Sequence, residues 1–383
     1  MTNVRLCRRC LYDALTPAMR FDETGMCNYC RVHDEMDHSH PTGKAGKEYL
    51  HTLAEKIRQE GKGKEYDVIV GVSGGTDSSY LLYQTKELGL RPLAVHFDNT
   101  WNSATAVRNM SRVLDALHVP LQTLVVDNEE YNDMYRAFLL AGVPDIDSPT
   151  DMGLAATLYR AAEEHGISTI FEGHSFRTEG IAPVGWNYID GQYIQSVVKR
   201  FGHFDEHRMR TFPNMHLRDF LRWILVKRIR KIRPLYWMDY QKSDAQKLLA
   251  EKFGWQWYGG HHLENTFTAF FHRLFMPQRF GRDLRILGYS ALVRSGQMTR
   301  EEGLALLATP MEPDPVLQAL VQKRLGFSDE EWEAMMHGPL RSFRDFHTSK
   351  QTFERLRPLF WILMKCNLVP ESFYRKYTSK KNI

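Results

Sequence analysis

The fold of this 383-residue chain is decided by the stretch Val68-Ile69-Val70-Gly71-Val72-Ser73-Gly74-Gly75-Thr76-Asp77-Ser78-Ser79. Four β-branched residues among its first five predict a buried strand, and residues 80–88 continue as a predicted helix with leucines on one side. A glycine turn between a strand and a helix can bind an anion. Its backbone N–H groups converge on phosphate oxygens, and the helix N-terminus adds partial positive charge.

The turn matches neither of two common nucleotide-binding motifs. It lacks the lysine of a Walker loop and the three glycines of the dinucleotide fingerprint. An ordinary strand–helix turn with a serine or aspartate cap is the structural alternative. Ser-Gly-Gly-x-Asp-Ser-Ser after such a strand resembles the PP-loop of the ATP pyrophosphatase superfamily, whose members split ATP between the α and β phosphates. The resemblance implies that ATP binds at Ser73, Gly74, Gly75, Thr76, Asp77, Ser78 and Ser79.

Strands and helices alternate after this loop. Strands are expected at 67–72, 93–97 and 121–126 and in a stretch that ends at 170–172, with a helix near 104–117. This alternation predicts an α/β fold with a doubly wound parallel sheet, like that of the adenine nucleotide α-hydrolases. Because ligands bind at the carboxyl ends of such strands, we expect site residues directly after them.

Two further strand ends carry candidate residues. Asp98 follows the second strand, where it either contacts the adenosine or caps a helix. In the loop at 172–180, Gly173 allows close backbone approach, and His174, Arg177 and Glu179 bring three ionisable groups together. A solvated loop is the alternative, but three such groups in one short loop favour a functional site.

Four of the five cysteines form two pairs, Cys7-x2-Cys10 and Cys27-x2-Cys30. This spacing predicts a structural Zn²⁺ ribbon, with an iron–sulfur site or a redox pair as alternatives. Residues 1–35 are too few to bury a core of their own, so we expect the metal to stabilise this segment. With all four positions filled by thiolates, the zinc is not expected to take part in catalysis.

The hydrophobic content, the net charge and the length of the apolar runs limit what kind of protein this chain can be. A chain that is 43% hydrophobic can bury a large core, and its length suggests two or three domains. The net charge of +4 and a pI near 8.7 are compatible with an anionic substrate and give no sign of a long nucleic-acid partner. No apolar run reaches about 18 residues and no signal sequence is evident, so a cytoplasmic protein without a membrane span is expected.

The second half of the chain is expected to be mainly helical. An amphipathic helix is predicted within 205–234, and its basic run at 227–233 either faces solvent or reaches a diphosphate. The next candidates are His262 and Glu264, which are expected to line a substrate pocket rather than bind metal, and Arg285. The predicted domains are a zinc ribbon at 1–40, a nucleotide-binding domain at 41–240 and a helical substrate or partner region at 241–383.

Several motifs together resemble the N-acetyl sugar amidotransferases of lipopolysaccharide and nonulosonic-acid biosynthesis. Besides the ribbon and the PP-loop, they are Arg233-Pro234-Leu235, Tyr258-Gly259-Gly260-x-His262-x-Glu264 and Ser295-Gly296-Gln297-Met298-Thr299-Arg300-Glu301-Glu302. The resemblance covers residues 1 to about 307. One departure is His261, at a position where the family is expected to have a lysine. A contact of that lysine with ATP phosphate or substrate is therefore not carried over to this chain.

This resemblance implies that ATP adenylates the acetamido group of a sugar and that ammonia replaces its oxygen, giving an acetamidino sugar. Asp77 would act through Mg²⁺, His174 or Glu179 would handle the proton of the ammonia, and Arg177, His262, Glu264 and Arg285 would bind the sugar. A separate glutamine amidotransferase subunit, with a barrel-type channel protein, would supply the ammonia. A tRNA thiolation enzyme and a non-catalytic nucleotide-binding subunit are the alternatives, although Cys366 is the one cysteine left to carry sulfur.

Overall fold

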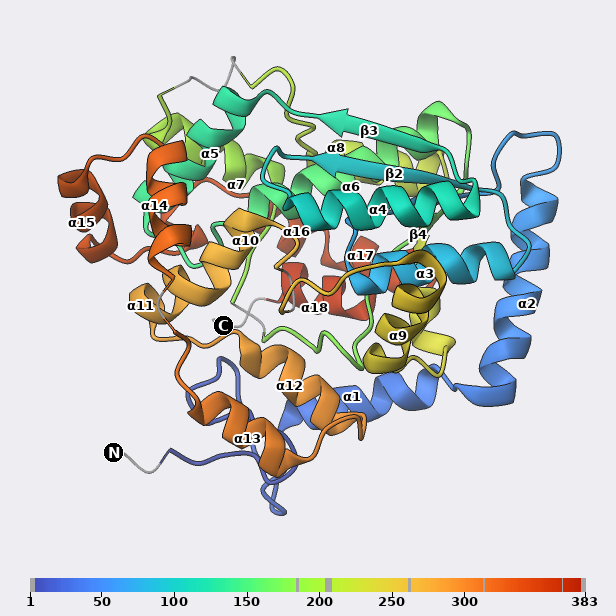
Figure 1. Cartoon of the computed structure of the whole chain (residues 1–383), viewed down its shortest axis with the longest axis horizontal. Coiled ribbons are helices and arrows are strands. Elements are labelled where there is room, and N and C mark those ends of the chain that lie inside the picture. The colour runs from blue at the N-terminus through green and yellow to red at the C-terminus, as the bar shows by residue number, and fades with distance from the viewer. Residues whose placement is uncertain are drawn as a thin grey trace.

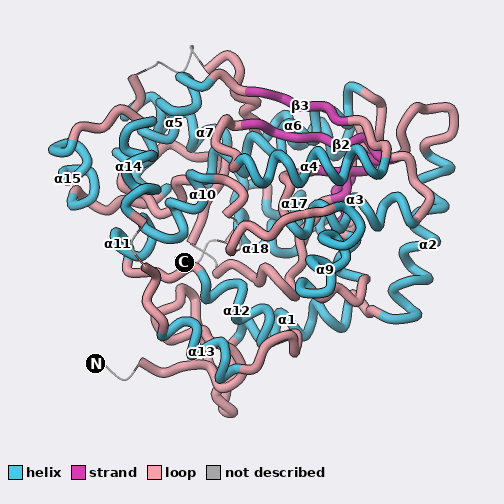
Figure 2. Tube along the Cα trace, viewed as in Figure 1, coloured by secondary structure: helices cyan, strands magenta, loops and turns pink. Residues whose placement is uncertain are grey.

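The computed structural model contains one five-stranded sheet within the residues it describes (Figures 1 and 2). These residues are 4–183, 186–203, 209–260, 263–312, 314–366 and 368–379. The strands are β1 (Val68–Gly71), β2 (Pro92–Asp98), β3 (Leu121–Val125), β4 (Thr169–Phe171) and β5 (Arg230–Ile232). They lie in the order β3-β2-β1-β4-β5, and each neighbouring pair is parallel. The expected parallel α/β sheet is confirmed.

The strand order reverses at β1. The chain adds β2 and β3 on one side of β1 and then returns to place β4 on the other side, with Val70 in register with both Ala94 and Phe171. In a doubly wound sheet, a crevice opens outside the carboxyl ends of the strands at such a reversal. The loops after β1 and β4 therefore flank the expected ligand site.

Helices cover both faces of this sheet. In the first two-thirds of the chain they are α1 (Asn28–Ser39), α2 (Gly43–Glu60), α3 (Thr76–Glu87), α4 (Ala104–Leu117), α5 (Asn128–Ala141), α6 (Ser148–Glu164), α7 (Gly191–Phe201), α8 (Leu217–Leu221) and α9 (Lys242–Phe253). Alternate residues of β1 point to opposite faces. Val70 packs in one core with Leu82 of α3, whereas Ile69 packs in the other with Tyr135 of α5 and Leu158 of α6.

The remainder of the chain is helical, as expected. It contains α10 (Thr266–Phe270), α11 (Met276–Phe280), α12 (Arg285–Arg294), α13 (Arg300–Ala308), α14 (Pro315–Arg324), α15 (Asp329–His337), α16 (Lys350–Arg355), α17 (Arg357–Lys365) and α18 (Glu371–Thr378). Short π-helical turns span Arg222–Val226 and Phe271–Phe275, and 3₁₀ turns span Pro234–Trp237 and Phe343–Asp345. In the described part of the chain, no helix combines the length and apolarity needed to cross a bilayer.

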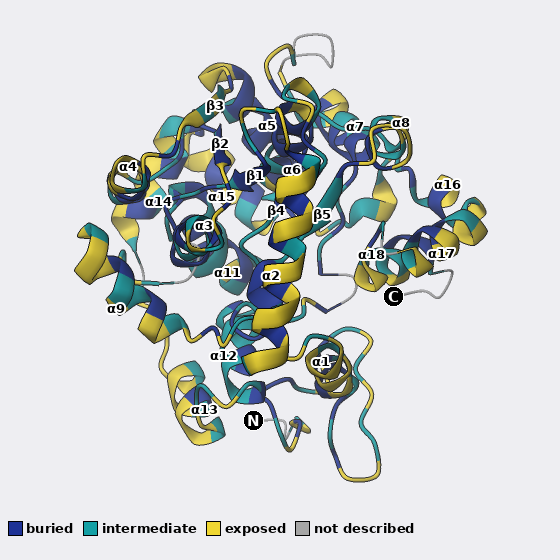
Figure 3. Cartoon of the chain, turned by 90° about the vertical axis from the view of Figure 1, so that its right-hand side faces the viewer, coloured by how far each residue is buried: buried dark blue, intermediate teal, exposed yellow. Residues whose placement is uncertain are grey.

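The segment between the cysteines and the sheet is more ordered than its polar sequence suggests. α1 and α2 occupy most of it and leave a three-residue corner at 40–42. α2 buries Leu50, Ala54 and Ile57 along one stripe and exposes its opposite side (Figure 3). His40 at the corner packs edge-on against Trp237, with ring centroids 4.5 Å apart. These contacts hold α1 and α2 against the nucleotide-binding half.

One predicted element is wrong. The basic run at 227–233 was expected to extend an amphipathic helix, but its centre forms β5, the edge strand beside β4. Arg230 pairs with Glu60 of α2 at 2.6 Å, and Lys231 pairs with Glu172 at 3.0 Å. Carboxylates from distant elements thus neutralise cations that the local pattern had assigned to a solvent-exposed helix face.

Candidate functional site

The PP-loop joins β1 to α3 in a conformation that requires glycine. Gly74 has φ +78°, and a Cβ at this position would lie 2.1 Å from the carbonyl oxygen of Ala106. The Ser78 hydroxyl accepts a hydrogen bond from the Ser73 amide at 3.2 Å. Gly75 forms the N-cap of α3 without a side-chain cap. No N-cap side chain binds the first amides of α3, and anion binding at these amides stays a prediction.

The loop after β4 packs directly against the PP-loop. A Cβ on Gly173 would lie 3.0 Å from the backbone nitrogen and Cα of Ser78. Gly173 therefore permits the close approach that was expected of it, and it brings the following residues to the N-terminus of α3.

Ionisable side chains from three segments converge at this contact. Asp77 is 8% exposed. It accepts a hydrogen bond from the Tyr240 hydroxyl, and its Oδ2 lies 3.2 Å from Lys242 Nζ. His174 Nδ1 is hydrogen-bonded to a carboxylate oxygen of Glu179. Burial raises the pKa of Asp77 to about 6; the Glu179 carboxyl adds to this increase, and Lys242 opposes it. The three residues predicted to be catalytic therefore form one cluster.

A C-terminal segment closes over the PP-loop. A Cβ on Gly75 would lie 3.1 Å from Glu264 Oε1 and 3.2 Å from the Tyr258 hydroxyl. Trp255 Nε1 donates to the carbonyl oxygen of Gly74 at 3.0 Å. Glu264 thus lies at the loop, where a substrate-binding residue was expected. His262 lies outside the described residues.

Asp98 ends β2 but does not cap a helix. Its Oδ1 accepts hydrogen bonds from the Thr100 amide at 2.8 Å and from Asn102 Nδ2 at 3.1 Å. Ser103 is the N-cap of α4 instead. The helix-cap interpretation of Asp98 is wrong, and its contact with adenosine stays a prediction.

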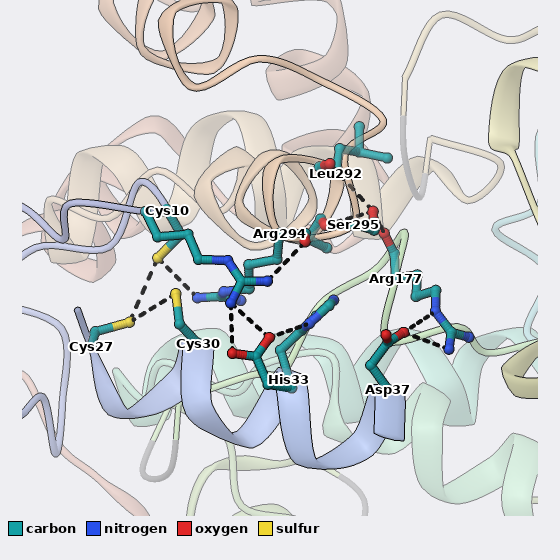
Figure 4. A network of polar contacts seen from close by, with 12 residues as sticks. Cys10, Cys27, Cys30, His33, Asp37, Arg177, Leu292, Arg294 and Ser295 are labelled. Atoms are coloured by element: carbon teal, nitrogen blue, oxygen red, sulfur yellow. Dashed lines mark hydrogen bonds and ion pairs between the residues drawn. The ribbon is translucent and has the colours of Figure 1, made fainter. Parts of the chain in front are cut away.

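Arg177 is held away from the Asp77 cluster by contacts with the N-terminal segment (Figure 4). Its Nε donates to Asp37 of α1 at 2.8 Å, Nη1 to the Tyr236 carbonyl at 2.6 Å, and Nη2 to the His40 carbonyl at 2.9 Å. On the other side, the hydroxyl of Ser295 donates to the Arg177 carbonyl at 2.8 Å. Arg177 was expected to bind substrate, but its guanidinium nitrogens are used to join the 172–180 loop to α1 and to the turn at Pro234–Trp237.

Arg285 forms local contacts at the start of α12. It pairs with Asp283 at 2.7 Å and donates to the Thr309 carbonyl at 2.9 Å. Neither contact involves the PP-loop or the 172–180 loop, so the structure does not bring Arg285 together with the other candidates. Its role in substrate binding stays a prediction.

Glu172 forms ion pairs with two cations, one in the strand beside it and one in the residue after that strand. Its carboxylate lies 3.0 Å from Lys231 Nζ and 2.7 Å from Arg233 Nε. Although burial opposes ionisation, these two cations hold the pKa of Glu172 well below its usual value. Neither cation is available to a diphosphate without breaking this pair, because both already bind Glu172.

The four cysteines form a compact buried cluster, and Figure 4 shows three of them, Cys10, Cys27 and Cys30. The Sγ–Sγ distances are 3.8 Å for Cys7–Cys30, 3.6 Å for Cys10–Cys27 and 3.6 Å for Cys27–Cys30. Four sulfurs bound to one zinc ion at 2.3 Å would lie about 3.8 Å apart, so the geometry fits one tetrahedral ion. Arg294 Nη2 donates to Cys10 Sγ at 3.2 Å, which places a positive charge beside the thiolates.

Four contributors were missed by sequence reasoning. Tyr240 and Lys242 reach Asp77 from more than 160 residues along the chain, and Trp255 and Tyr258 cover the glycines. The sequence contained a signal for Tyr258, because it belongs to the same motif as Glu264. The other contacts join residues far apart in the chain, and such contacts leave no local pattern in the sequence.

Comparison with known proteins gives one family match. Residues 264–358 match the model of the C-terminal domain of WbpG-like lipopolysaccharide biosynthesis proteins. A stretch of 128 residues is 33% identical to the tRNA-specific 2-thiouridylase MnmA of Proteus mirabilis. That alignment covers 30% of this chain and only 35% of the thiouridylase.

Structural comparison returns remote matches. The NH3-dependent NAD synthetase of Campylobacter jejuni has a TM-score of 0.32 and 12% identity, over 77% of this chain and 98% of that one. The U34-tRNA thiolase NcsA of Methanococcus maripaludis, solved with its [4Fe-4S] cluster, has a TM-score of 0.30 and 13% identity, over 76% and 87%. These scores are too low to assign the chain to either enzyme. Residues 264–358 are thus similar to the C-terminal domain of WbpG-like lipopolysaccharide biosynthesis proteins, and the glycine loop after β1 of the parallel sheet resembles a PP-loop.

Proposed function

We propose that the chain is an ATP-dependent amidotransferase, a carbon–nitrogen ligase that converts the acetamido group of a free or nucleotide-linked sugar into an acetamidino group in surface polysaccharide biosynthesis. The main support is the position of the His174–Glu179 pair beside Asp77 at the N-terminus of α3. This arrangement places a proton acceptor next to a predicted triphosphate site. The match to WbpG-like proteins supports the biosynthetic context.

The chemistry requires activation of the amide. Resonance in an amide, reflected in a rotational barrier of about 18–20 kcal/mol, makes its oxygen a poor leaving group. In the proposed reaction the amide oxygen attacks the α phosphorus of ATP, so that an O–P bond forms and pyrophosphate leaves. The lone pair of ammonia then adds to the amide carbon, the C–O bond breaks, and AMP departs with the former amide oxygen.

Residues of this chain fit the two halves of that reaction. We assign the amides and hydroxyls of the PP-loop to binding pyrophosphate, with Lys242 as a nearby cation. We assign Glu179 and His174 to accepting the proton that ammonia loses as AMP departs. Mg²⁺, when bound with ATP, would offset phosphate charge. The adjoining carboxyls of Asp77 and Glu179 provide the hard oxygen ligands that it prefers.

Sulfur transfer is the second candidate because of the similarity to the thiouridylase. Such chemistry needs a sulfur carrier near the nucleotide. The four ribbon cysteines are buried within 4.8 Å of one another, which suits a structural metal, and Cys366 is exposed at the end of α17. The PP-loop and the 172–180 loop contain no cysteine. These positions favour nitrogen over sulfur as the incoming atom.

An oxygen-tracing experiment tests the proposal. The full chain is incubated with ATP, Mg²⁺, ammonium and nucleotide-linked diacetamido sugars labelled with ¹⁸O in the acetamido groups. We expect the label to appear in AMP and not in pyrophosphate, with one oxygen of the sugar replaced by NH. Glu179→Gln is expected to reduce the rate by about 10²-fold, whereas Glu87→Gln, an exposed change on α3, should have no effect. Pyrophosphate release that depends on tRNA but not on sugar would contradict the proposal.

A further inference from the structure

Arg282 and Trp186 come from different segments and meet outside the Asp77 cluster. Arg282 follows Gly281, the left-handed residue that ends α11. Trp186 lies on the chain that leads from the 172–180 loop to α7. The guanidinium carbon of Arg282 is 5.7 Å from the centroid of the Trp186 ring, so the ring supports the cation from one side.

Both side chains have a buried donor without an acceptor. Trp186 is 8% exposed, and its Nε1 has no hydrogen-bond partner among the residues that the structure describes; the same holds for Nη1 of Arg282, which is partly buried. The neighbouring carboxylate, Asp283, is already paired with Arg285. Burial lowers the pKa of Arg282. An unpaired buried charge is costly, so these donors are poised for an anion.

A neighbouring arginine shows what a purely structural arrangement looks like. Arg279 on α11 is also partly buried, but its Nη1 donates to the carbonyls of Met336 and Gly338 at 2.8 Å, and its Nη2 donates to that of Pro339 at 3.1 Å. Among the described residues, the guanidinium of Arg282 has no comparable set of carbonyl partners, although Nε of Arg279 is likewise buried without an acceptor. Packing alone therefore does not explain why a cation is kept at this position.

The length of the chain limits how far Trp186 can lie from the reactive loop. Six residues lie between Glu179 and Trp186, so the two are at most roughly 25 Å apart. Between them, Gly180 packs against α12; it has φ +90°, and a Cβ there would lie 2.7 Å from the carbonyl oxygen of Leu287. The Ile181 carbonyl accepts a hydrogen bond from Tyr12 at 3.0 Å. These contacts hold Gly180 and Ile181 in place directly after Glu179.

We propose that Arg282 and Trp186 form a subsite for an anionic group of the sugar substrate, either a ring carboxylate or a phosphate of its carrier. A guanidinium can donate two parallel hydrogen bonds to either group, and the indole N–H can add a third. This inference rests on the proposed function, because it assigns the anion to the molecule whose acetamido group lies at His174 and Glu179. It also predicts that a neutral, free acetamido sugar binds weakly.

The test measures binding of two probes to the full chain by calorimetry, with UDP as the phosphate probe and glucuronate as the carboxylate probe. Arg282→Gln is expected to weaken the binding of at least one probe by about tenfold or more. Arg282→Lys keeps the positive charge but cannot donate two parallel hydrogen bonds, so it should weaken binding by less. Trp186→Phe should cause a smaller loss because the ring stays. The control is Arg273→Gln, which removes an arginine paired with Asp314 and should bind both probes normally.

The two probes distinguish a phosphate of the carrier from a carboxylate of the sugar ring. Loss of UDP binding alone would identify the group as a phosphate, and loss of glucuronate binding alone would identify it as a carboxylate. The proposal is overturned if the wild-type chain binds neither probe, or if Arg282→Gln, with unchanged thermal stability and ATP affinity, binds both as the wild type does. If Arg282-dependent binding is found but no amidine forms, the amidotransferase function fails and the anion subsite stands.

Discussion

At the scale of single residues, the sequence predicted the parts of the site that depend on local backbone geometry. Gly74 and Gly173 are needed where a Cβ would collide with another chain segment, and both were identified from their positions after strands. The partners of Asp77 were not predictable in this way. Tyr240 and Lys242 reach it only once the sheet and α9 have packed, and it is this packing that buries the Asp77 carboxyl.

The substitution Asp77→Asn should raise thermal stability at high pH and at the same time lower turnover. The pKa of Asp77 is raised to about 6 in the folded chain, above its ordinary value near 3.8, so the folded state retains a proton that the unfolded state releases. Asp77 therefore makes the protein less stable as pH rises from about 4 through 6. Because asparagine cannot ionise, we expect a higher Tm than wild type at pH 8, no difference at pH 4, and turnover lower by ~10²-fold.

Thermal unfolding at the two pH values and initial rates check this prediction. Glu87→Gln serves as the control, since it removes an exposed carboxylate from the same helix. A variant that loses stability and activity in parallel would show that Asp77 is needed for folding rather than for the reaction.

At the scale of elements, the sequence predicted four of the five strands but not β5. Residues 230–233, which comprise β5 and the residue after it, carry three cations, and such a run predicts a helix with a charged outer face. Glu60 from α2 and Glu172 from the end of β4 provide the pairing that lets this segment lie beside β4. These partners are distant in sequence, so no local pattern could have shown that the cations would be neutralised.

Cys27→Ser should loosen the 172–180 loop as well as the ribbon. Cys27 is the N-cap of α1, and Asp37 near the other end of this helix binds Arg177. Loss of the metal should free α1 and remove that contact. We expect the zinc content to fall from about one ion per chain to near zero and hydrogen exchange at 174–180 to increase.

Metal analysis and hydrogen exchange with mass spectrometry measure the two effects. Cys366→Ser is the matched control, because Cys366 is exposed and outside the cluster. A zinc-free Cys27→Ser chain that keeps native protection in the loop and full stability would overturn the ribbon assignment.

At the scale of the whole molecule, the two ends of the chain pack around the sites described above. The ribbon contacts α12 through Arg294, and α12 in turn contacts the 172–180 loop through Ser295 (Figure 4). The match at 264–358 includes α12, so a domain recognised in lipopolysaccharide biosynthesis proteins contributes to the same assembly. The sequence predicted these three parts, but their mutual packing depends on contacts between residues nearly 300 positions apart.

The last prediction concerns the source of nitrogen. A glutaminase needs an activated nucleophile. The cysteines of this chain are four buried residues in one cluster and the exposed Cys366, whose sequence context lacks a glycine-rich elbow. We therefore propose that a separate glutamine amidotransferase subunit, with a barrel-type channel protein, delivers ammonia to the adenylated amide and keeps water out.

The isolated chain should accordingly use ammonium salts and not glutamine. Only unprotonated ammonia has a free lone pair, so turnover at a fixed ammonium concentration should increase as pH rises through the titration of ammonium. Rates plotted against the concentration of free ammonia should then fall on a single curve. Amidine formation is the quantity to measure, with ammonium chloride or glutamine as the nitrogen source. Efficient glutamine-dependent turnover by the purified chain would rule out the need for a partner, and a rate independent of free ammonia would place the limiting step before nitrogen attack.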